Sequence, residues 1–166
     1  MEADQPIIRV GIGTDLHRLA AGRRLVLGGV TVPFELGLAG HSDGDVVLHA
    51  VMDAILGAAG LPDIGAQFPD DDPALRGADS REMMRRTVEQ VRRAGYRIVN
   101  VDLVVHAERP RLSAHKSSIR DSVAALLGVE GGRVSIKAKT AEGTDAVGRG
   151  EAIACTAVAG LSRSEP

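Results

Sequence analysis

The chain has 166 residues, a formal net charge of −2, an aromatic content of 2% and one cysteine, Cys155. We expect a single domain over residues 1–166, which is large enough to fold without a disulfide, with flexible ends at 1–8 and 162–166. Because a single cysteine cannot form a disulfide within the chain, we expect an inert, buried thiol and a cytoplasmic protein. The charge and the scarcity of aromatic rings argue against nucleic acid as a partner, and no apolar run is long enough to span a membrane.

Hydrophobic periodicity predicts the order of strands and helices along the chain. We expect strands over residues 9–15, 96–106, 133–139 and 151–161, and a hairpin at the sheet edge over 24–33. We expect helices from Ser42 to Gly57 or Gly60, from 79 to about 94, and from 113 to 127. The irregular stretch over 61–77 is long enough to be a functional loop. This order predicts an α+β fold, mainly one sheet with helices packed on one face.

Two histidines and one aspartate form a candidate metal site. Asp15 and His17 are two residues apart at the end of the first expected strand, so their side chains project from one face. His49 would lie on the second turn of the first expected helix. Two imidazoles and one carboxylate, with a fourth position open, match a catalytic zinc site.

The start of the same helix is a candidate anion site. Ser42 suits the N-cap and Asp45 completes a capping-box-like pair, so His41 and Ser42 would lie where a helix N-terminus attracts a phosphate oxygen. Asp45 or Asp53, each four residues from His49, would orient the imidazole of His49. A simple helix cap and a packed histidine account for the same residues, so spacing alone leaves these interpretations open.

Several separate motifs occur in one order between about Arg9 and Leu161. They are Gly11-x-Gly13-x-Asp15-x-His17, His41-Ser42-Asp43-Gly44-Asp45 with His49, Asp63-Ile64-Gly65-x-x-Phe68-Pro69-Asp70-x-Asp72-Pro73, Gly77-Ala78-Asp79-Ser80 and Gly148-Arg149-Gly150-Glu151. In these motifs and their order, the chain resembles the 2-C-methyl-D-erythritol 2,4-cyclodiphosphate synthase family. The resemblance implies a ferredoxin-like subunit assembled as a homotrimer, with active sites between neighbouring subunits.

The activity implied by the resemblance is a metal-dependent intramolecular phosphoryl transfer. The family converts 4-diphosphocytidyl-2-C-methyl-D-erythritol 2-phosphate into 2-C-methyl-D-erythritol 2,4-cyclodiphosphate and releases CMP, as a phosphorus–oxygen lyase of the non-mevalonate isoprenoid pathway. The resemblance implies Zn²⁺ or a similar ion at Asp15, His17 and His49, and a second cation, Mg²⁺ or Mn²⁺, at Glu142. Phosphoryl transfer of this kind depends mainly on positioning and electrostatics.

The resemblance also implies substrate contacts. His41 and Ser42 would bind the attacking phosphate, and Thr140 would donate its hydroxyl to the diphosphate. A loop that closes over the methylerythritol unit would consist of Asp63, Ile64, Gly65, Phe68, Pro69, Asp70, Asp71 and Asp72. The cytosine and the phosphates would be bound by Ala107, Pro110, Arg111, Leu112, Ser113, Lys139, Ala141, Glu142 and Arg149, with Glu151 paired to an arginine along the trimer axis. From the residues alone, these segments are also typical of turns, a loop and a solvated strand end.

Three residues depart from the family pattern. Lys139 and Ala141 stand where hydroxyl residues are often found, and Ala146 stands at a position that is frequently aromatic. We therefore expect the loop of the second cation and the central cavity of the trimer to differ in detail from the family. Two other functions remain open, a divalent-metal phosphoesterase that activates water and a trimeric module that binds a cytidine nucleotide without turnover.

Overall fold

A main β-sheet, a small second sheet and a set of helices make up residues 8–69, 71–75 and 77–163, the part of the protein that the computed structural model describes. The strands are β1 (Ile8–Ala20), β2 (Leu25–Leu27), β3 (Val30–Val32), β4 (Gly37–Leu38), β5 (Tyr96–His106), β6 (Val134–Lys139) and β7 (Ala152–Arg163). The helices are α1 (Val46–Ala59), α2 (Ile64–Gln67), α3 (Ser80–Arg93), α4 (Lys116–Leu127) and α5 (Asp145–Gly148), with 3₁₀ turns η1 (Pro73–Leu75) and η2 (Gly131–Arg133).

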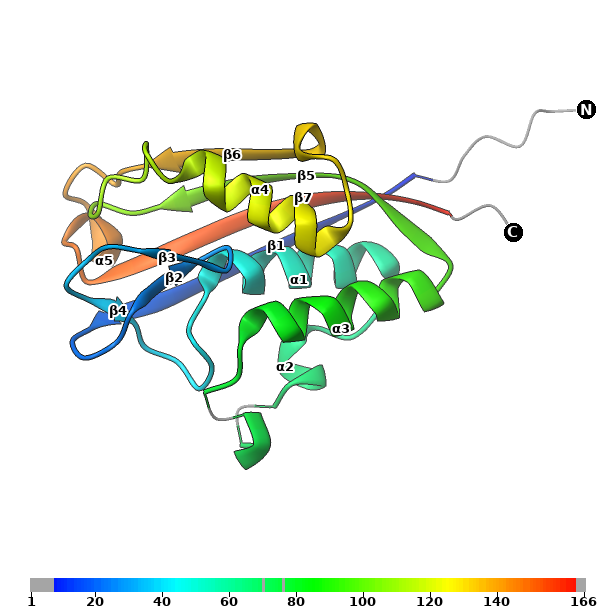
Figure 1. Ribbon diagram of the computed structural model, residues 1–166, viewed down its shortest axis with the longest axis horizontal. Coiled ribbons are helices and arrows are strands. Elements are labelled where there is room, and N and C mark those ends of the chain that lie inside the picture. Colours follow the sequence, from blue (N-terminus) through cyan, green and yellow to red (C-terminus); the bar gives the residue numbers. More distant parts are fainter. Residues whose placement is uncertain (1–7, 70, 76, 164–166) are drawn as a thin grey trace, which may run out of the picture.

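The main sheet has the strand order β4-β1-β7-β5-β6 (Figure 1). β7 pairs antiparallel with both β1 and β5, whereas β5 and β6 are parallel. Helices α1, α3 and α4 lie on one face of this sheet (Figure 1). The arrangement confirms the predicted α+β fold with helices on one face of a main sheet. The predicted hairpin exists as β2 and β3, but it forms its own two-stranded sheet and not the edge of the main one.

Two glycines allow α1 to lie directly on β1. A Cβ atom added to Gly13 would lie 2.0 Å from the carbonyl oxygen of Ala50, and one added to Gly11 would lie 2.1 Å from that of Ala54. No side chain fits at either position, so the helix approaches the strand backbone closely. Because side chains alternate along β1, Asp15 lies on the same face as these glycines, next to the helix.

On the opposite face of the sheet, β1 and β7 carry exposed apolar side chains. Ile8, Val10, Ile12 and Leu16 alternate along β1 and are 58% to 69% exposed, and Val158 on β7 is 40% exposed. A row of large apolar side chains open to solvent is uncommon on a monomeric protein. This face is therefore a candidate interface with another chain.

The start of α1 differs from the prediction. The helix begins at Val46 with Asp45 as its N-cap, and not with Ser42, because the Asp45 carboxylate accepts hydrogen bonds from two N–H groups of the first turn, both at 3.1 Å. The same fully buried carboxylate accepts the two N–H groups of the Gly28–Gly29 turn at 2.8 and 2.6 Å. It thereby ties the β2–β3 hairpin to the helix. His49 is consequently the fourth residue of α1 and lies one turn nearer the N-terminus than predicted.

Most other boundaries follow the hydrophobic periodicity. β5 has its predicted bounds. α1 ends at Ala59, and the following residue, Gly60, has a left-handed backbone conformation. α3 begins directly after its predicted cap, Asp79. The predicted irregular stretch over 61–77 contains α2 and η1, and the short elements β4 and α5 were not predicted. β1 and β7 include Ile8 and Arg163, in segments that we expected to be flexible. Among the described residues, no helix combines the length and the apolar character needed to cross a membrane.

Candidate metal centre and two cavities

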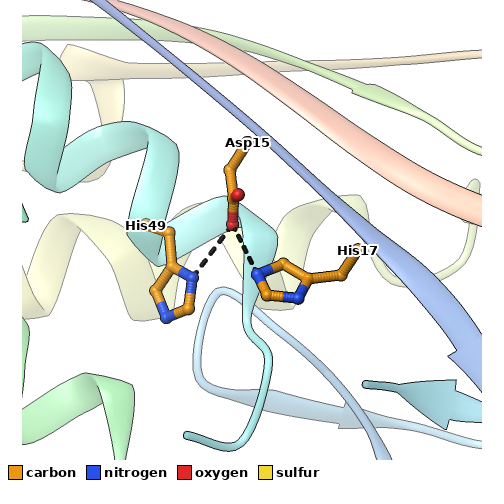
Figure 2. Close-up of side chains that lie close together, drawn as sticks. All are labelled: Asp15, His17 and His49. Carbon is orange, nitrogen blue, oxygen red and sulfur yellow. Dashed lines mark hydrogen bonds and ion pairs between the residues drawn. The ribbon is translucent and has the colours of Figure 1, made fainter. Parts of the chain in front are cut away.

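Three side chains from β1 and α1 converge on one point (Figure 2). Oδ2 of Asp15 lies 3.0 Å from Nε2 of His17 and 2.9 Å from Nδ1 of His49. One donor atom of each residue lies within 4.8 Å of the other two, as the ligands of one ion would. The two imidazole rings meet edge to face, with their centroids 5.4 Å apart. The structure therefore brings the three predicted ligands together.

Contacts on the outer side of each imidazole direct its inner nitrogen toward the aspartate. Nδ1 of His17 donates to the carbonyl oxygen of Ala39, so Nε2 is the atom that faces the cluster. Nε2 of His49 lies 3.0 Å from Oγ of Ser80 and 3.3 Å from Oγ of Ser42, so Nδ1 faces the cluster. Metal-binding histidines are commonly oriented by such a hydrogen bond from the second ring nitrogen.

The two aspartates that we expected to orient His49 are bound elsewhere. Asp45 caps α1, and Asp53 accepts a hydrogen bond from the N–H of Ile64 at 2.9 Å. Ser80, the first residue of α3, contacts the imidazole instead and is completely buried. Spacing rules could not reveal this contact, because 31 positions separate the two residues. The sequence indicated only that Ser80 follows a helix cap.

The three donors form a chemically suitable set for a divalent cation. Burial disfavours the charged form of Asp15, but hydrogen bonds with His17 and His49 outweigh this effect and hold the pKa of the carboxyl group well below its usual range. The group is therefore ionised at neutral pH, and one nitrogen of each imidazole faces it. Two imidazoles and one carboxylate match the protein ligands of catalytic zinc sites, which leave a fourth position for water or substrate.

The cluster lines a cavity of about 350 Å³. Six further predicted contacts line the same cavity, namely His41, Ser42, Ile64, Gly65, Phe68 and Pro69. Gly40, Leu75 and Met83 also line it and were not predicted. The Phe68 ring is buried, and the guanidinium carbon of Arg86 lies 5.0 Å from its centroid. The cavity thus combines a charged cluster with apolar surface from the segment around α2.

Hydrogen bonds from the Arg23 side chain hold the backbone of the loop that carries His41 and Ser42. Arg23 donates hydrogen bonds to the carbonyl oxygen of Gly40 at 3.0 Å and to that of Ser42 at 2.5 Å. The N–H groups of Val47 and Leu48, in the first turn of α1, are already bound by the carboxylate of Asp45. These two groups are therefore not available to an anion. The predicted reason for an anion site, free N–H groups at the start of the helix, was wrong in this respect. His41 and Ser42 nevertheless line the cavity.

Asp63, Asp71 and Asp72, the described aspartates of the predicted closing loop, do not line this cavity. Asp63 is the N-cap of α2 and accepts a hydrogen bond from the N–H of Ala66 at 2.9 Å. Asp71 and Asp72 are exposed, and Asp70 lies outside the described residues. Among its described residues, the loop lines the cavity with Ile64, Gly65, Phe68 and Pro69, and not with carboxylates.

A second cavity, of about 280 Å³, lies where β5 and β6 end. Its lining contains the predicted contacts Ala107, Pro110, Arg111, Leu112, Ser113, Lys139 and Thr140. The parallel pairing of the two strands joins these segments, and the N–H of Ala107 donates to the carbonyl oxygen of Lys139 at 2.9 Å. Ala141 and Glu142 follow in the adjoining loop, where Glu142 is exposed. The metal cluster and these segments therefore line different cavities of one chain.

Arg149 and Glu151 form an exposed ion pair beyond this loop. Nε of Arg149 lies 2.9 Å from Oε1 of Glu151, and Nη2 lies 3.1 Å from Oε2. The hydrogen bond to Arg149 lowers the pKa of Glu151. Glu151 therefore has an arginine partner within its own chain.

Comparison with known proteins identifies the family. A profile described as YgbB family matches residues 8–162, which include both cavities. The chain belongs to the YgbB family. The 2-C-methyl-D-erythritol 2,4-cyclodiphosphate synthase of Bordetella petrii is 55% identical over 156 residues, which cover 94% of this YgbB family chain and 96% of that protein. The synthase of the same name from Symbiobacterium thermophilum is 55% identical over 150 residues, which cover 90% of this chain and 96% of that protein. These matches confirm the resemblance found in the motifs.

Solved structures share the fold of this YgbB family member. Bifunctional IspDF from Campylobacter jejuni has a TM-score of 0.93 at 37% identity, and the match covers 97% of this chain but 44% of that one. A CDP complex of IspF from Plasmodium falciparum has a TM-score of 0.83 at 32% identity, and the match covers 95% of this chain and 97% of that one. A CDP-bound structure of 2C-methyl-D-erythritol-2,4-cyclodiphosphate synthase has a TM-score of 0.85 at 38% identity, covering 92% and 99%.

Proposed function

We propose that the protein converts 4-diphosphocytidyl-2-C-methyl-D-erythritol 2-phosphate into 2-C-methyl-D-erythritol 2,4-cyclodiphosphate and CMP, as a phosphorus–oxygen lyase of the non-mevalonate isoprenoid pathway. The observation that carries this proposal is the cavity in which Asp15, His17 and His49 lie beside His41, within a YgbB family chain. Relatives that are 55% identical over nearly their whole length carry the name of this synthase. The buried, unpaired thiol of Cys155 supports a cytoplasmic location.

We assign Zn²⁺ to the three-ligand cluster and Mg²⁺ or Mn²⁺ to Glu142. When bound, these ions would polarise phosphoryl oxygens and serve as a template for the diphosphate. Two imidazole donors support zinc at the cluster, because nitrogen ligands suit that ion. An exposed carboxylate, two residues after Thr140, supports a hard cation at the second position.

The other side chains of the two cavities would bind and orient the substrate. The attacking 2-phosphate is already anionic and belongs to the same molecule as its target, so it needs orientation more than a strong base. His41 and Ser42 line the cluster cavity and would bind this phosphate. Phe68 would limit the access of water through its apolar ring. Thr140 and the backbone of 107–113 would hold the cytidyl diphosphate.

The metal cluster lines one cavity and the segment 107–113 lines another, and we infer that the two cavities meet across a subunit boundary. We propose a homotrimer of ferredoxin-like subunits, in which the metal cluster of one subunit faces the nucleotide segments of its neighbour. The apolar row on β1, 58% to 69% exposed at Ile8, Val10, Ile12 and Leu16, is a surface that such an assembly would bury. The CDP bound in two related structures supports a cytidine nucleotide as the ligand.

The fate of water oxygen tests the reaction. The zinc-loaded protein is mixed with Mg²⁺ and the cytidyl substrate in water enriched in ¹⁸O, and the products are followed by ³¹P NMR and mass spectrometry. We expect CMP and the cyclic diphosphate in equal amounts and without label, because no water is consumed. Label in a phosphorus product, or a linear diphosphate formed directly, would establish a metal phosphoesterase instead. Nucleotide binding without any turnover would establish a cytidine-nucleotide-binding module.

A further inference from the structure

The hydroxyl of Ser80 lies on the outer side of the His49 imidazole. Its Oγ is 3.0 Å from Nε2, while Nδ1 on the inner side of the ring is 2.9 Å from Oδ2 of Asp15. Ser80 is 0% exposed and His49 is 7% exposed, so solvent water does not substitute for this contact. The Ser42 hydroxyl is farther from Nε2, at 3.3 Å. The ring is therefore held between a carboxylate and a buried hydroxyl.

Asp43 determines the direction in which the Ser80 hydroxyl points. Oδ1 of Asp43 is 2.5 Å from Oγ of Ser80, and it also lies 3.2 Å from the backbone nitrogen of Asp45. Oδ2 accepts the N–H of Ser80 at 3.2 Å. Since an ionised carboxylate only accepts hydrogen bonds, the hydroxyl hydrogen of Ser80 goes to Asp43. The lone pairs of Oγ then remain to accept a hydrogen bond from His49.

In the metal-free chain the ionised Asp15 accepts a hydrogen bond from Nδ1 of His49, so the contact with Ser80 favours the form of the neutral imidazole that binds an ion when the ion replaces that hydrogen. When Ser80 accepts from Nε2, the ring hydrogen is on Nε2 and a lone pair is on Nδ1, the atom that faces Asp15. A nitrogen must present a lone pair to bind a metal ion, so this is the form of His49 that the cluster needs. We propose that Ser80, held by Asp43, is a positioning residue that prepares His49 for metal binding. This inference rests on the metal-dependent function proposed above.

A merely structural role for Ser80 and Asp43 makes a different prediction. These residues also join the start of α3 to the loop before α1, so their loss is expected to reduce stability under either role. A matched control is available in Thr87 on the same helix, which is 0% exposed and donates its hydroxyl to the carbonyl oxygen of Met83 at 3.0 Å. Thr87→Val removes a buried hydroxyl from α3 without changing any contact of the cluster.

Zinc affinity, measured by competition with a chelator, distinguishes the two roles. We expect Ser80→Ala to bind zinc about 10- to 100-fold more weakly than the wild-type chain, as is typical when the partner of a metal-binding histidine is removed. Thr87→Val should bind zinc as tightly as wild type despite its lower stability. Equal zinc affinity of Ser80→Ala and the wild-type chain would overturn the inference.

Asp43→Asn tests the second step of the argument. Both oxygens of Asp43 face backbone N–H groups, so the amide of asparagine must turn its NH₂ group toward one of them. An amide hydrogen that points at Ser80 would also turn the Ser80 hydroxyl toward His49 and favour the wrong form of the ring. We therefore expect a loss of zinc affinity similar to that of Ser80→Ala. Wild-type affinity in Asp43→Asn would remove Asp43 from the mechanism and overturn the proposal as stated.

A measurement on the wild-type chain does not depend on how any variant folds. Long-range ¹H–¹⁵N NMR of zinc-loaded protein with ¹⁵N-labelled histidine reports which nitrogen of His49 carries hydrogen. We expect hydrogen on Nε2 and zinc on Nδ1. Hydrogen on Nδ1 would overturn this inference while leaving the metal-dependent function intact. A wild-type chain that binds no zinc would overturn both.

Discussion

The cluster cavity and the second cavity are built in different ways. The cluster cavity, of about 350 Å³, takes its charged groups from β1 and α1, where Asp15, His17 and His49 are held by hydrogen bonds. The second cavity, of about 280 Å³, is lined largely by the loops that follow β5 and β6. Regular elements fix side chains more precisely than loops do. In the proposed function, this difference would hold the reacting groups rigidly in one part of the chain and leave recognition of the nucleotide to another.

Loss of a ligand from the cluster cavity is expected to have the largest effect. His49→Ala deletes one of three donors, so we expect loss of bound zinc and a decrease in turnover of about 1000-fold or more, because a bound ion contributes several kcal/mol to such a reaction. The far-UV circular dichroism should remain that of a folded chain. Zinc is measured by mass spectrometry and turnover by CMP release.

His115→Ala is the matched control for this variant. His115 precedes α4, lines neither cavity and makes no side-chain capping bond, so its loss should leave zinc content and turnover unchanged. Undiminished zinc in purified His49→Ala would show that His49 is not a ligand. In that case the cluster would be a hydrogen-bonded group with no bound ion.

Mixed trimers test whether the two cavities meet across subunits. His49→Ala damages the cluster and Glu142→Ala removes the proposed ligand of the second cation, so each chain alone should be inactive. If neighbouring subunits share a site, every mixed trimer contains one intact site, and random exchange should restore about one quarter of wild-type activity. CMP release is measured after native mass spectrometry has confirmed subunit exchange.

The control for this experiment combines two lesions of the same cavity. His49→Ala mixed with Asp15→Ala leaves no intact cluster in any trimer, so no activity should return. Failure of the first mixture to recover, despite confirmed exchange, would contradict a site shared between subunits. Recovery in the control mixture would show that the two ligands are not both required.

The sequence predicted the cluster cavity from side-chain chemistry, and the second cavity only through the resemblance. Alternation along a strand places Asp15 beside His17, and the same type of local rule places His49 near the start of a helix. The segment 107–113 is a loop whose expected contribution is backbone atoms, which leave no residue pattern. No local rule could therefore assign it to a nucleotide.

Contacts between distant segments explain the predictions that were wrong. The capping rules favoured Ser42 as the first cap of α1, but Asp45 also binds the Gly28–Gly29 turn, and this buried tertiary contact decides where the helix begins. Ser80 reaches His49 across 31 positions in the same way. β4 and α5 were not predicted because two and four residues are too few to show a period.

The close packing of α1 on β1 can be broken by one methyl group. An added Cβ at Gly13 would lie 2.0 Å from the carbonyl oxygen of Ala50, and backbone atoms there cannot move independently. We expect Gly13→Ala to lower the free energy of unfolding by about 2 to 4 kcal/mol, and to weaken zinc binding by displacing His49 from Asp15. Urea unfolding of metal-free protein measures the first effect and chelator competition the second.

Gly57→Ala on α1 is the matched control. A Cβ at Gly57 would have nothing within 4 Å, so this substitution should raise the free energy of unfolding by about 0.5 to 1 kcal/mol and leave zinc binding unchanged. A Gly13→Ala chain as stable as wild type would mean that α1 can move away from β1 at little cost. The rigid support of the cluster would then have another origin.

The smallest expected effect concerns acid stability and tests whether the cluster is organised before an ion binds. Burial opposes the charge on Asp15, but hydrogen bonds with His17 and His49 prevail and lower its pKa in the folded chain. A carboxyl group with a lowered folded pKa stabilises the fold above its unfolded pKa of about 4, and this contribution is lost as the pH falls toward the folded value. Metal-free wild-type protein should therefore lose stability more steeply than Asp15→Asn below about pH 4.

Urea unfolding in the presence of EDTA, repeated at several pH values from neutral to acidic, measures this difference. Asp71→Asn, which removes an exposed carboxylate outside the cluster cavity, should follow the wild-type chain. If wild type and Asp15→Asn lose stability in parallel, the two histidines do not stabilise the charge of Asp15 in the absence of metal. The cluster would then be assembled by the ion, and the contrast between a rigid metal cavity and a nucleotide cavity made of loops would hold only for the metal-bound protein.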